Sequence, residues 1–271
     1  MTLSSSSLRR LRQHNLVFGW LFGYVRIEPD GDEMCRVSVG SQNIHLVNPN
    51  RWRRYRRGIP RQLRRLARTY GATDHAKQFP GKLVLDIGAN IGEFTLYARA
   101  NGAQVIAIEP DRTNLKVLKK NVGVEGVRIV EKALWKETAR LPLYSAPMDA
   151  DSGLIAAPTC AETYEVDAAR LDDVTRELDA GEIFFIKGDA EGAEPEVLQG
   201  ATATLARTHY ISFDCGPERQ GKSTADCSAK ILENAGFSVQ LLKRRRTIVF
   251  GANKRFANAW PLASPHDRCE D

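Results

Sequence analysis

Three carboxylates follow an apolar run in the second half of the chain. The segment FFIKGDAEGAEPEVLQG (184–200) begins like a buried strand, and Asp189, Glu191 and Glu194 then arrive within six residues. A carboxylate at the end of a strand, in a partly dry pocket, can accept the proton of an attacking hydroxyl. Glu191 and Glu194 could instead favour the positive N-terminus of the helix that follows. The pattern predicts a general base at Asp189, with Glu191 as its partner in catalysis.

A glycine-rich turn follows another apolar run nearer the start of the chain. The sequence LVLDIGANIGEF (83–94) places Asp86 at the end of a predicted strand, and then Gly88, Asn90 and Gly92 before a predicted helix. Glycines at such a turn let the backbone approach a ligand, and the helix N-terminus offers free N–H groups. The loop lacks the G-x-G-x-x-G spacing of a dinucleotide site, and the Asp86 carboxylate suits a cationic ligand better than a pyrophosphate.

A further acidic residue completes this pattern. Glu109 ends the next predicted strand, 21 residues after Gly88. A carboxylate at this place can accept both hydroxyls of a ribose. A ribose clamp and negative charge, without a phosphate site, are what S-adenosylmethionine requires, so the two motifs together predict that cofactor. The predicted cofactor-binding residues are Asp86, Gly88, Ala89, Asn90, Gly92, Glu109 and Ala133.

The elements that must position these residues are seven short apolar runs that alternate with helical patterns from Lys82 onward. Runs without polar alternation predict a mostly parallel sheet, buried on both faces by helices. Only KRRR (243–246) separates the last two runs, too short a connection for a crossover helix, so this pair must be antiparallel. The segment 134–170 is irregular and is expected to form short strands and a mobile loop. The predicted strands are 82–88, 105–109, 127–133, 182–187, 209–214, 237–242 and 247–252.

Three motifs stand in a fixed order along the chain: LDIGANIGEFTL (85–96), AIEP (107–110) and FIKGDAEGAEPEVLQGA (185–201). In this order they resemble the FkbM-type methyltransferases, and the resemblance covers roughly residues 80–252. It implies an α/β fold of the class I methyltransferase (Rossmann-like) type, a three-layer sandwich with a mostly parallel seven-stranded sheet and an antiparallel last strand. It also implies methyl transfer to hydroxyls of sugars, glycolipids or polyketide-like small molecules.

The resemblance puts Asp189 and Glu191 near the reacting atoms. This chain departs from the family pattern at Gly188 and Ala190, where bulky apolar residues are usual, and the smaller residues would enlarge a pocket or loosen the sheet edge. At the end of the fifth strand stands an aspartate where the family often has glutamate. The predicted substrate-binding residues are Lys187, Glu194 and Asp214.

Basic residues are concentrated at the front of the chain. Residues 1–80 contain fifteen Lys and Arg against five Asp and Glu, whereas the remainder is slightly acidic. The segment RWRRYRRGIPRQLRRLARTY (51–70) contains nine arginines, and its second half predicts an amphipathic helix. Three interpretations stay open: solvated or intramolecular arginines, contact with an anionic membrane or lipid-linked substrate, and binding of nucleic acid. No recognisable nucleic-acid-binding module accompanies the segment, so we rank that partner lowest.

Two further features bear on the compartment. Five scattered cysteines without C-x-x-C spacing or nearby paired histidines predict neither a disulfide framework nor a zinc site, and favour a reducing compartment. The apolar stretch LVFGWLFGYV (16–25) follows three arginines as a signal peptide would, but it is too short to span a bilayer and no cleavage site follows. We expect it to pack on the main domain, in a cytoplasmic protein that is either free or peripheral to the inner face of the membrane.

These observations predict a basic N-terminal extension (1–79), a methyltransferase domain (80–254) and a C-terminal tail (255–271). The predicted function is S-adenosylmethionine-dependent O-methyl transfer to a small polar, sugar or glycolipid-type acceptor, with no metal. Two alternatives use the arginine-rich segment. One is an RNA methyltransferase, and the other is a non-catalytic module that binds an anionic polymer or membrane on the same fold.

Overall fold

The structure is a computed structural model that describes residues 5–123, 125–146, 148, 152–156, 160–219, 221–243 and 246–256. Its central sheet has seven strands in the order β12-β13-β11-β10-β4-β5-β6. Neighbouring strands are parallel except at β13, which is antiparallel to both β11 and β12. The predicted class I methyltransferase arrangement is therefore confirmed, including the hairpin across 243–246. The strands are β4 (Leu83–Ile87), β5 (Gln104–Ile108), β6 (Val127–Val130), β10 (Ile183–Gly188), β11 (Thr208–Asp214), β12 (Phe237–Lys243) and β13 (Thr247–Asn253).

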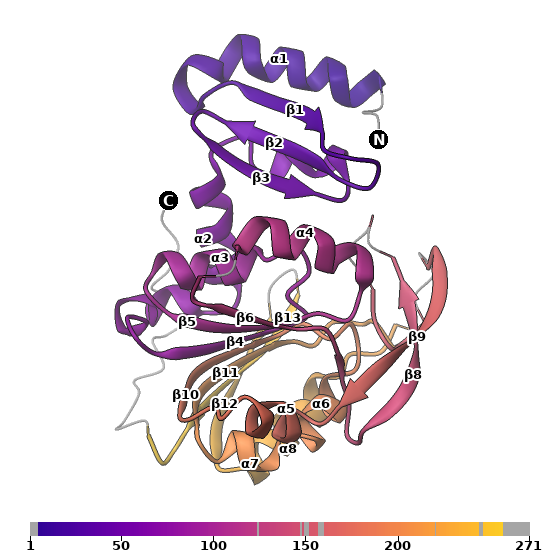
Figure 1. The fold of residues 1–271 in the computed structure, drawn as a ribbon. Helices are drawn as coiled ribbons and strands as arrows, with labels where there is room; N and C mark the ends of the chain where they lie inside the picture. The colour runs from indigo at the N-terminus through magenta and orange to yellow at the C-terminus, as the bar shows by residue number, and fades with distance from the viewer. Residues whose placement is uncertain are drawn as a thin grey trace.

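Helices cover both faces of this sheet (Figure 1). Successive residues of a strand point to opposite faces. Accordingly, Val84 and Phe185 belong to the apolar core under one set of helices, whereas Leu85 and Ile186 belong to the core under the other set. The first set is α2 (Ile59–Thr69), α3 (Glu93–Ala100) and α4 (Arg112–Val122); the second is α5 (Leu171–Glu177), α6 (Glu194–Gln199), α7 (Thr202–Leu205) and α8 (Ala225–Asn234).

A small antiparallel sheet precedes the central one. It contains β1 (Val25–Pro29), β2 (Cys35–Val39) and β3 (Gln42–Leu46), and α1 (Ser5–Phe22) lies on its side away from the central sheet (Figure 1). The prediction that 16–25 packs on the main domain is wrong for its helical part, 16–22, whereas Val25 begins β1 and is buried. Only Ser7 and Gly19 of α1 are buried, because the helix lies on the outer side of the small sheet and turns its apolar second half outward.

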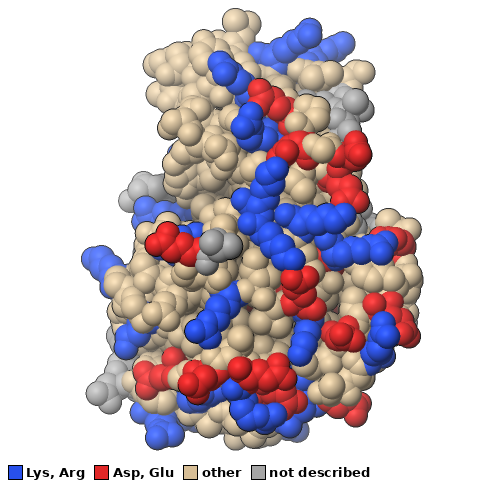
Figure 2. Space-filling view, in the orientation of Figure 1, with Lys and Arg blue, Asp and Glu red and all other residues tan. Residues whose placement is uncertain are grey.

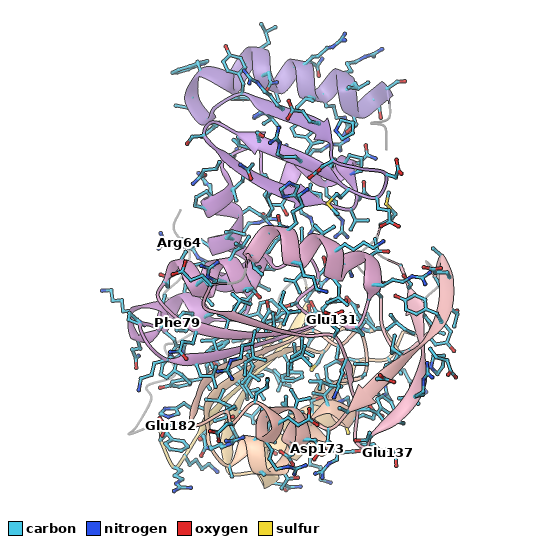
Figure 3. The ribbon with its side chains drawn as sticks, in the orientation of Figure 1. Arg64, Phe79, Glu131, Glu137, Asp173 and Glu182 are labelled. Carbon is cyan, nitrogen blue, oxygen red and sulfur yellow. The ribbon has the colours of Figure 1, made fainter. Side chains whose placement is uncertain are left out.

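The segment between the two sheets packs into the core of the central sheet. It contains the 3-10 helices η1 (Pro49–Arg54), η2 (Ala72–Asp74) and η3 (Ala76–Gln78) around α2. Trp52, Tyr70 and Phe79 share one apolar cluster with Phe94 of α3 and Phe250 of β13. In Figure 3, Phe79 lies by the amino ends of the central strands, and its ring contacts Phe184 and Phe185 of β10. The division at residue 79/80 stays a prediction, and the tail from 257 onward lies outside the described residues.

A third sheet lies beside the carboxyl ends of the central strands. Its order is β7-β9-β8, from β7 (Ala133–Leu134), β8 (Ala139–Ser145) and β9 (Glu162–Ala169). The short strands predicted in 134–170 are thus confirmed. The predicted loop falls largely on positions 147, 149–151 and 157–159, which lie outside the described residues.

Candidate active site

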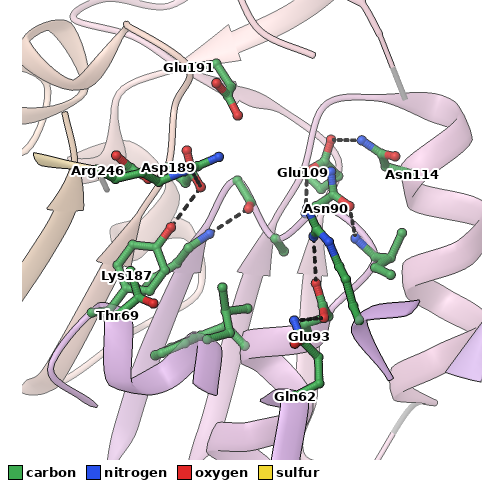
Figure 4. Close-up of a pocket in the computed structure, with 18 of the residues that line it drawn as sticks. Gln62, Thr69, Asn90, Glu93, Glu109, Asn114, Lys187, Asp189, Glu191 and Arg246 are labelled. Atoms are coloured by element: carbon green, nitrogen blue, oxygen red, sulfur yellow. Dashed lines mark hydrogen bonds and ion pairs between the residues drawn. The ribbon is translucent and has the colours of Figure 1, made fainter. Parts of the chain in front are cut away.

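The carboxyl ends of β4, β5, β10 and β11 open onto a cavity of about 440 Å³ (Figure 4). Residues of α2 and Arg246, which directly precedes β13, complete its lining. The structure brings together eight residues that the sequence singles out, which line this cavity: Gly88, Ala89, Asn90, Glu109, Lys187, Asp189, Glu191 and Asp214. Their common position follows from topology, because the carboxyl ends of parallel strands meet at one edge of a sheet.

The glycine loop is shaped by contacts within the protein. Gly88 has a φ of +65°, and a Cβ added there would lie 1.9 Å from the carbonyl oxygen of Asp189. Gly92 has a φ of +89°, and its added Cβ would lie 2.7 Å from a methyl carbon of Leu118. Both conformations disfavour residues with a Cβ, and at Gly88 the contact with a backbone atom leaves no room for one. The glycines therefore let β10 and α4 approach the loop closely.

Glu109 is the acidic residue at the end of β5, and it is only 4% exposed. Its carboxylate accepts hydrogen bonds from the backbone N–H of Asn90 at 2.7 Å, from the backbone N–H of Asp111 at 2.9 Å and from Asn114 Nδ2 at 3.4 Å. Burial raises its pKa to about 7. Beside it, the buried Oδ1 of Asn114 accepts no hydrogen bond from the described residues. A carboxylate has about four acceptor positions, so this corner retains acceptors for a ligand's hydroxyl or amino groups.

Asp86 and Lys187 form a buried pair behind the glycine loop. The Lys187 Nζ lies 3.1 Å from Asp86 Oδ1 and donates to the carbonyl oxygens of Ile87 at 3.0 Å and Gly88 at 2.7 Å. Thr95 donates its hydroxyl to Asp86 at 2.7 Å. Burial alone would lower the pKa of Lys187, but Asp86 and Asp189 outweigh burial and raise it. The pair ties the loop to β10. Direct ligand contact by either residue stays a prediction.

Asp189 stands at the centre of a charged group on the β10 side of the cavity. Its Oδ2 accepts a hydrogen bond from the Tyr70 hydroxyl at 2.8 Å and lies 3.5 Å from Arg246 Nη1. The same guanidinium nitrogen contacts Oδ2 of the buried Asp214. Burial, followed by the nearby Asp189 charge, raises the pKa of Asp214 to about 6. One arginine therefore bridges two carboxylates whose mutual repulsion it offsets.

The two predicted glutamates lie in different places. Glu191, at a φ of +48°, points into the space between Asp189 and Glu109 (Figure 4). Glu194 is fully buried outside the cavity, where it accepts hydrogen bonds from the backbone N–H of Gly192 at 2.9 Å and from the Thr224 hydroxyl at 2.6 Å. Burial raises the pKa of Glu194 to about 7. Its contacts hold the turn after β10 against the start of α8, and substrate contact by Glu194 stays a prediction.

Ala133 lines a smaller adjoining pocket of about 40 Å³. This pocket shares Gly88, Glu109 and Asp189 with the main cavity, and most of its remaining wall is apolar, from Ile87, Ile108, Pro110, Leu134, Leu154 and Val197. A flat apolar ring would suit it better than a charged group.

Several cavity residues were not predicted from the sequence. Tyr70 and Arg246 hold Asp189, although KRRR was interpreted only as a turn. Three arginines of the 51–70 segment also line the cavity, namely Arg51, Arg54 and Arg65. Arg64 of the same segment is exposed and does not line the cavity, lying at the edge of the molecule (Figure 3). The spacing of the basic residues alone could not distinguish these two positions.

Glu93 explains how that segment is attached to the cavity wall. It accepts hydrogen bonds from the Tyr55 hydroxyl at 2.9 Å and from Gln62 Nε2 at 3.1 Å, and Arg54 Nη1 lies 4.0 Å from it. Because Glu93 begins α3, these contacts fix η1 and α2 directly over the glycine loop. The arginine-rich segment is therefore part of the cavity wall.

Comparison with known proteins identifies the family. Residues 86–239 match the sequence model of the methyltransferase FkbM domain, and this is more than half of the chain. The chain belongs to the FkbM methyltransferase family. It is thus a methyltransferase that uses S-adenosylmethionine, as predicted, and the resemblance read from the three motifs is confirmed.

Curated relatives share this part of the chain. Methyltransferase 1 of Beauveria bassiana is 32% identical over 183 residues, which are 58% of this chain and 72% of that protein. The 2-O-methyltransferase NoeI of Sinorhizobium fredii is 30% identical over 152 residues, which are 49% of this chain and 62% of NoeI, less than two thirds of its length. Among solved structures, magnesium protoporphyrin IX methyltransferase of Synechocystis, with bound SAM, is 12% identical; the match covers 93% of this chain and 100% of that one, with a TM-score of 0.44.

Proposed function

We propose that this FkbM methyltransferase transfers a methyl group to a hydroxyl of a small polar, sugar or glycolipid-type acceptor. The single observation that carries the proposal is the position of Asp189, held by Tyr70 and Arg246 in the cavity that Glu109 and the glycine loop also line. One relative in the family, NoeI, is named a 2-O-methyltransferase, which supports oxygen as the methyl-accepting atom.

The residues around Glu109 fit the cofactor. S-adenosylmethionine supplies a methyl group on a positively charged sulfonium. The Glu109 carboxylate and the Asn114 Oδ1, which accepts no hydrogen bond from the part of the chain that the structure describes, are acceptors that suit ribose hydroxyls or an amino group. The apolar pocket around Ala133 suits an adenine ring. The carboxylates of Asp189 and Glu191, which face the same space, suit the positive charge.

Asp189 is the proposed general base. When an acceptor oxygen attacks the methyl group, the bond between that methyl and the sulfonium sulfur would break, S-adenosylhomocysteine would leave as a neutral thioether, and the hydroxyl would lose its proton. A fixed carboxylate within hydrogen-bond reach can accept that proton. The Tyr70 hydroxyl and Arg246 both contact Oδ2 of Asp189 and so restrict the orientation of its carboxylate. The other oxygen, Oδ1, is therefore the atom proposed to accept the proton. Most of the rate would come from holding the acceptor oxygen in line with the methyl group.

The arginines of η1 and α2 support an acceptor that carries an anionic group. Arg51, Arg54 and Arg65 line the same cavity as Asp189. Guanidinium groups bind phosphate and carboxylate in a fixed, forked geometry. Their position inside a cavity of about 440 Å³ favours a sugar phosphate or acidic glycolipid head group over an extended RNA strand.

The test separates cofactor binding from methyl transfer. S-adenosylhomocysteine is titrated calorimetrically into wild type and Asp189→Asn, and labelled methyl transfer is measured on monosaccharides, sugar phosphates and acidic glycolipids. We expect near-equal affinity for the two proteins and a loss of turnover of about 1,000-fold in the variant. The control is Asp167→Asn, whose carboxyl is 71% exposed on β9. An equal loss of affinity and turnover would contradict the role of Asp189, and transfer to amines alone would contradict the acceptor class.

A further inference from the structure

Large apolar side chains gather on the exposed surface of the second half of α1. Leu16 is 84% exposed and Trp20 78%, and Tyr24, just beyond the helix, is 58% exposed. Val17, Phe18 and Leu21 are also exposed. Single exposed apolar residues are common on soluble proteins, but a contiguous group of this kind marks a surface that another phase or molecule covers.

Arginines occupy the first half of the same outward face. At 100° per residue, Arg9 and Arg12 project on the same side as Leu16 and Trp20, opposite the buried Ser7. The outward face of α1 is therefore cationic along its first half and apolar along its second. Figure 2 shows this change as blue side chains over one end of α1 and tan side chains over the other.

We propose that this face of α1 docks the protein on an anionic phospholipid surface. The apolar second half would enter the boundary between head groups and acyl chains, while the arginines contact lipid phosphates. Trp20 and Tyr24 are the side-chain types that concentrate at this boundary. The helix would lie in the plane of the surface, and among the described residues no helix is long and apolar enough to cross a bilayer.

Charge argues against a second copy of the chain as the partner. Residues 5–22 contain no aspartate or glutamate, so two facing α1 helices could not pair their arginines. An antiparallel pair would bury Arg9 and Arg12 of one copy against Leu16 and Trp20 of the other, leaving charges desolvated without partners. A lipid surface with negative head groups satisfies both halves of the face. The proposal does not depend on the identity of the methyl acceptor.

The test is sedimentation of the full chain with vesicles of phosphatidylcholine alone or with 30% phosphatidylglycerol. We expect binding to the anionic vesicles, weaker binding to the neutral ones, and loss of binding as salt increases. Leu16→Ser/Trp20→Ser should weaken binding at least about tenfold. The variant Arg9→Gln/Arg10→Gln/Arg12→Gln should weaken it on the order of 100-fold on anionic vesicles.

The controls remove exposed cations and an exposed apolar side chain elsewhere on the protein. Lys119→Gln/Lys136→Gln/Arg140→Gln removes three exposed cations from the body, and Met148→Ser removes a side chain that is 40% exposed. Both controls should bind like wild type. Circular dichroism checks folding, and the salt dependence of wild type tests the proposal without any variant. Equal binding of all variants, no vesicle binding by wild type, or a dimer in solution that Leu16→Ser/Trp20→Ser dissociates would each overturn the proposal.

Discussion

The two halves of the cavity are built in different ways. The half at β4 and β5 comes from one continuous stretch, in which Glu109 is held mainly by backbone N–H groups of Asn90 and Asp111. The half at β10, β11 and β13 is assembled from distant segments, with Asp189 held by Tyr70, 119 residues earlier, and by Arg246, 57 residues later. Neighbours in sequence thus form the proposed cofactor side, whereas only the complete fold forms the proposed acceptor side.

The difference extends to electrostatics. Glu109 is 4% exposed, and its donors are neutral amides. The side chain of Asp189 is 21% exposed, and its partner Arg246 is 48% exposed and charged. Salt screens exposed charges more than buried ones. We therefore expect ionic strength to affect the acceptor half and pH near 7 to affect the cofactor half.

The largest effect is expected where the halves touch. Gly88→Ala would place a Cβ 1.9 Å from the Asp189 carbonyl oxygen, so β4 and β10 would have to separate at their carboxyl ends. We expect a loss of about 3 kcal/mol or more in the free energy of unfolding, measured by denaturant titration. Any folded fraction should bind S-adenosylhomocysteine at least about 100-fold more weakly, because both halves move.

Gly81→Ala is the matched control. Gly81 has a similar φ of +72°, but an added Cβ would have no atom within 4 Å. The control should therefore show only the backbone cost of the left-handed conformation, about 1 kcal/mol. Similar losses in the two variants would mean that the contact between Gly88 and Asp189 does not join the halves.

An intermediate effect is expected from Arg246→Gln, which addresses the acceptor half alone. Without the guanidinium, the Tyr70 hydroxyl and the more distant charge of Lys187 are left to offset the repulsion between Asp189 and Asp214. Removing one partner of a buried pair costs about 3–5 kcal/mol in the free energy of unfolding, and the half-exposed arginine reduces this to about 2 kcal/mol. Turnover should fall on the order of 10- to 100-fold, because the Asp189 carboxylate loses one of the two contacts that orient it. Affinity for S-adenosylhomocysteine, measured by calorimetry, should change less than about threefold, since Arg246 does not contact Glu109.

The pH profile sharpens this test. Arg246 holds down the pKa of Asp214, which is already raised to about 6. Its removal should raise that pKa further, so activity that requires the carboxylates would be lost at a higher pH as the solution is acidified. Arg140→Gln, at a side chain that is 69% exposed, is the control and should leave the profile unchanged. If the acidic side of the pH–activity profile does not shift in Arg246→Gln, protonation of Asp214 does not control the activity.

The smallest effect is expected from Glu109→Gln in the cofactor half. The amide keeps the shape but loses acceptor capacity, so we expect about tenfold weaker binding of S-adenosylhomocysteine. Because burial raises the pKa of Glu109 to about 7, wild-type affinity should fall as pH decreases through 7, where the carboxylate becomes protonated. Calorimetry from pH 6 to pH 8 measures this slope, which should be absent in the variant. The same slope in both proteins would assign the titration to another group.

The sequence predicted the fold because each strand is a short apolar run and the last connection is too short to cross the sheet. It also predicted the grouping of Gly88, Asn90 and Glu109, since these follow directly from two strand ends. Tyr70 and Arg246 were missed because their contacts depend on how α2 and β13 pack, which no local spacing reveals. The helical part of the apolar stretch, 16–22, was wrongly expected to pack inward, because its composition does not tell which side of a helix faces the protein.

The hydrogen bond from Tyr70 to Asp189 has a consequence for how members of the family are sorted. The segment that matches the family model, 86–239, includes Asp189 but neither Tyr70 nor Arg246. Two proteins can therefore match the family model equally well along that segment and still hold the aspartate equivalent to Asp189 with different partners. If Asp189 is the general base, as proposed, such proteins share the base and differ in the residues that orient it. Comparing those residues requires alignment of the end of α2 and of the β12–β13 hairpin, in addition to the shared segment.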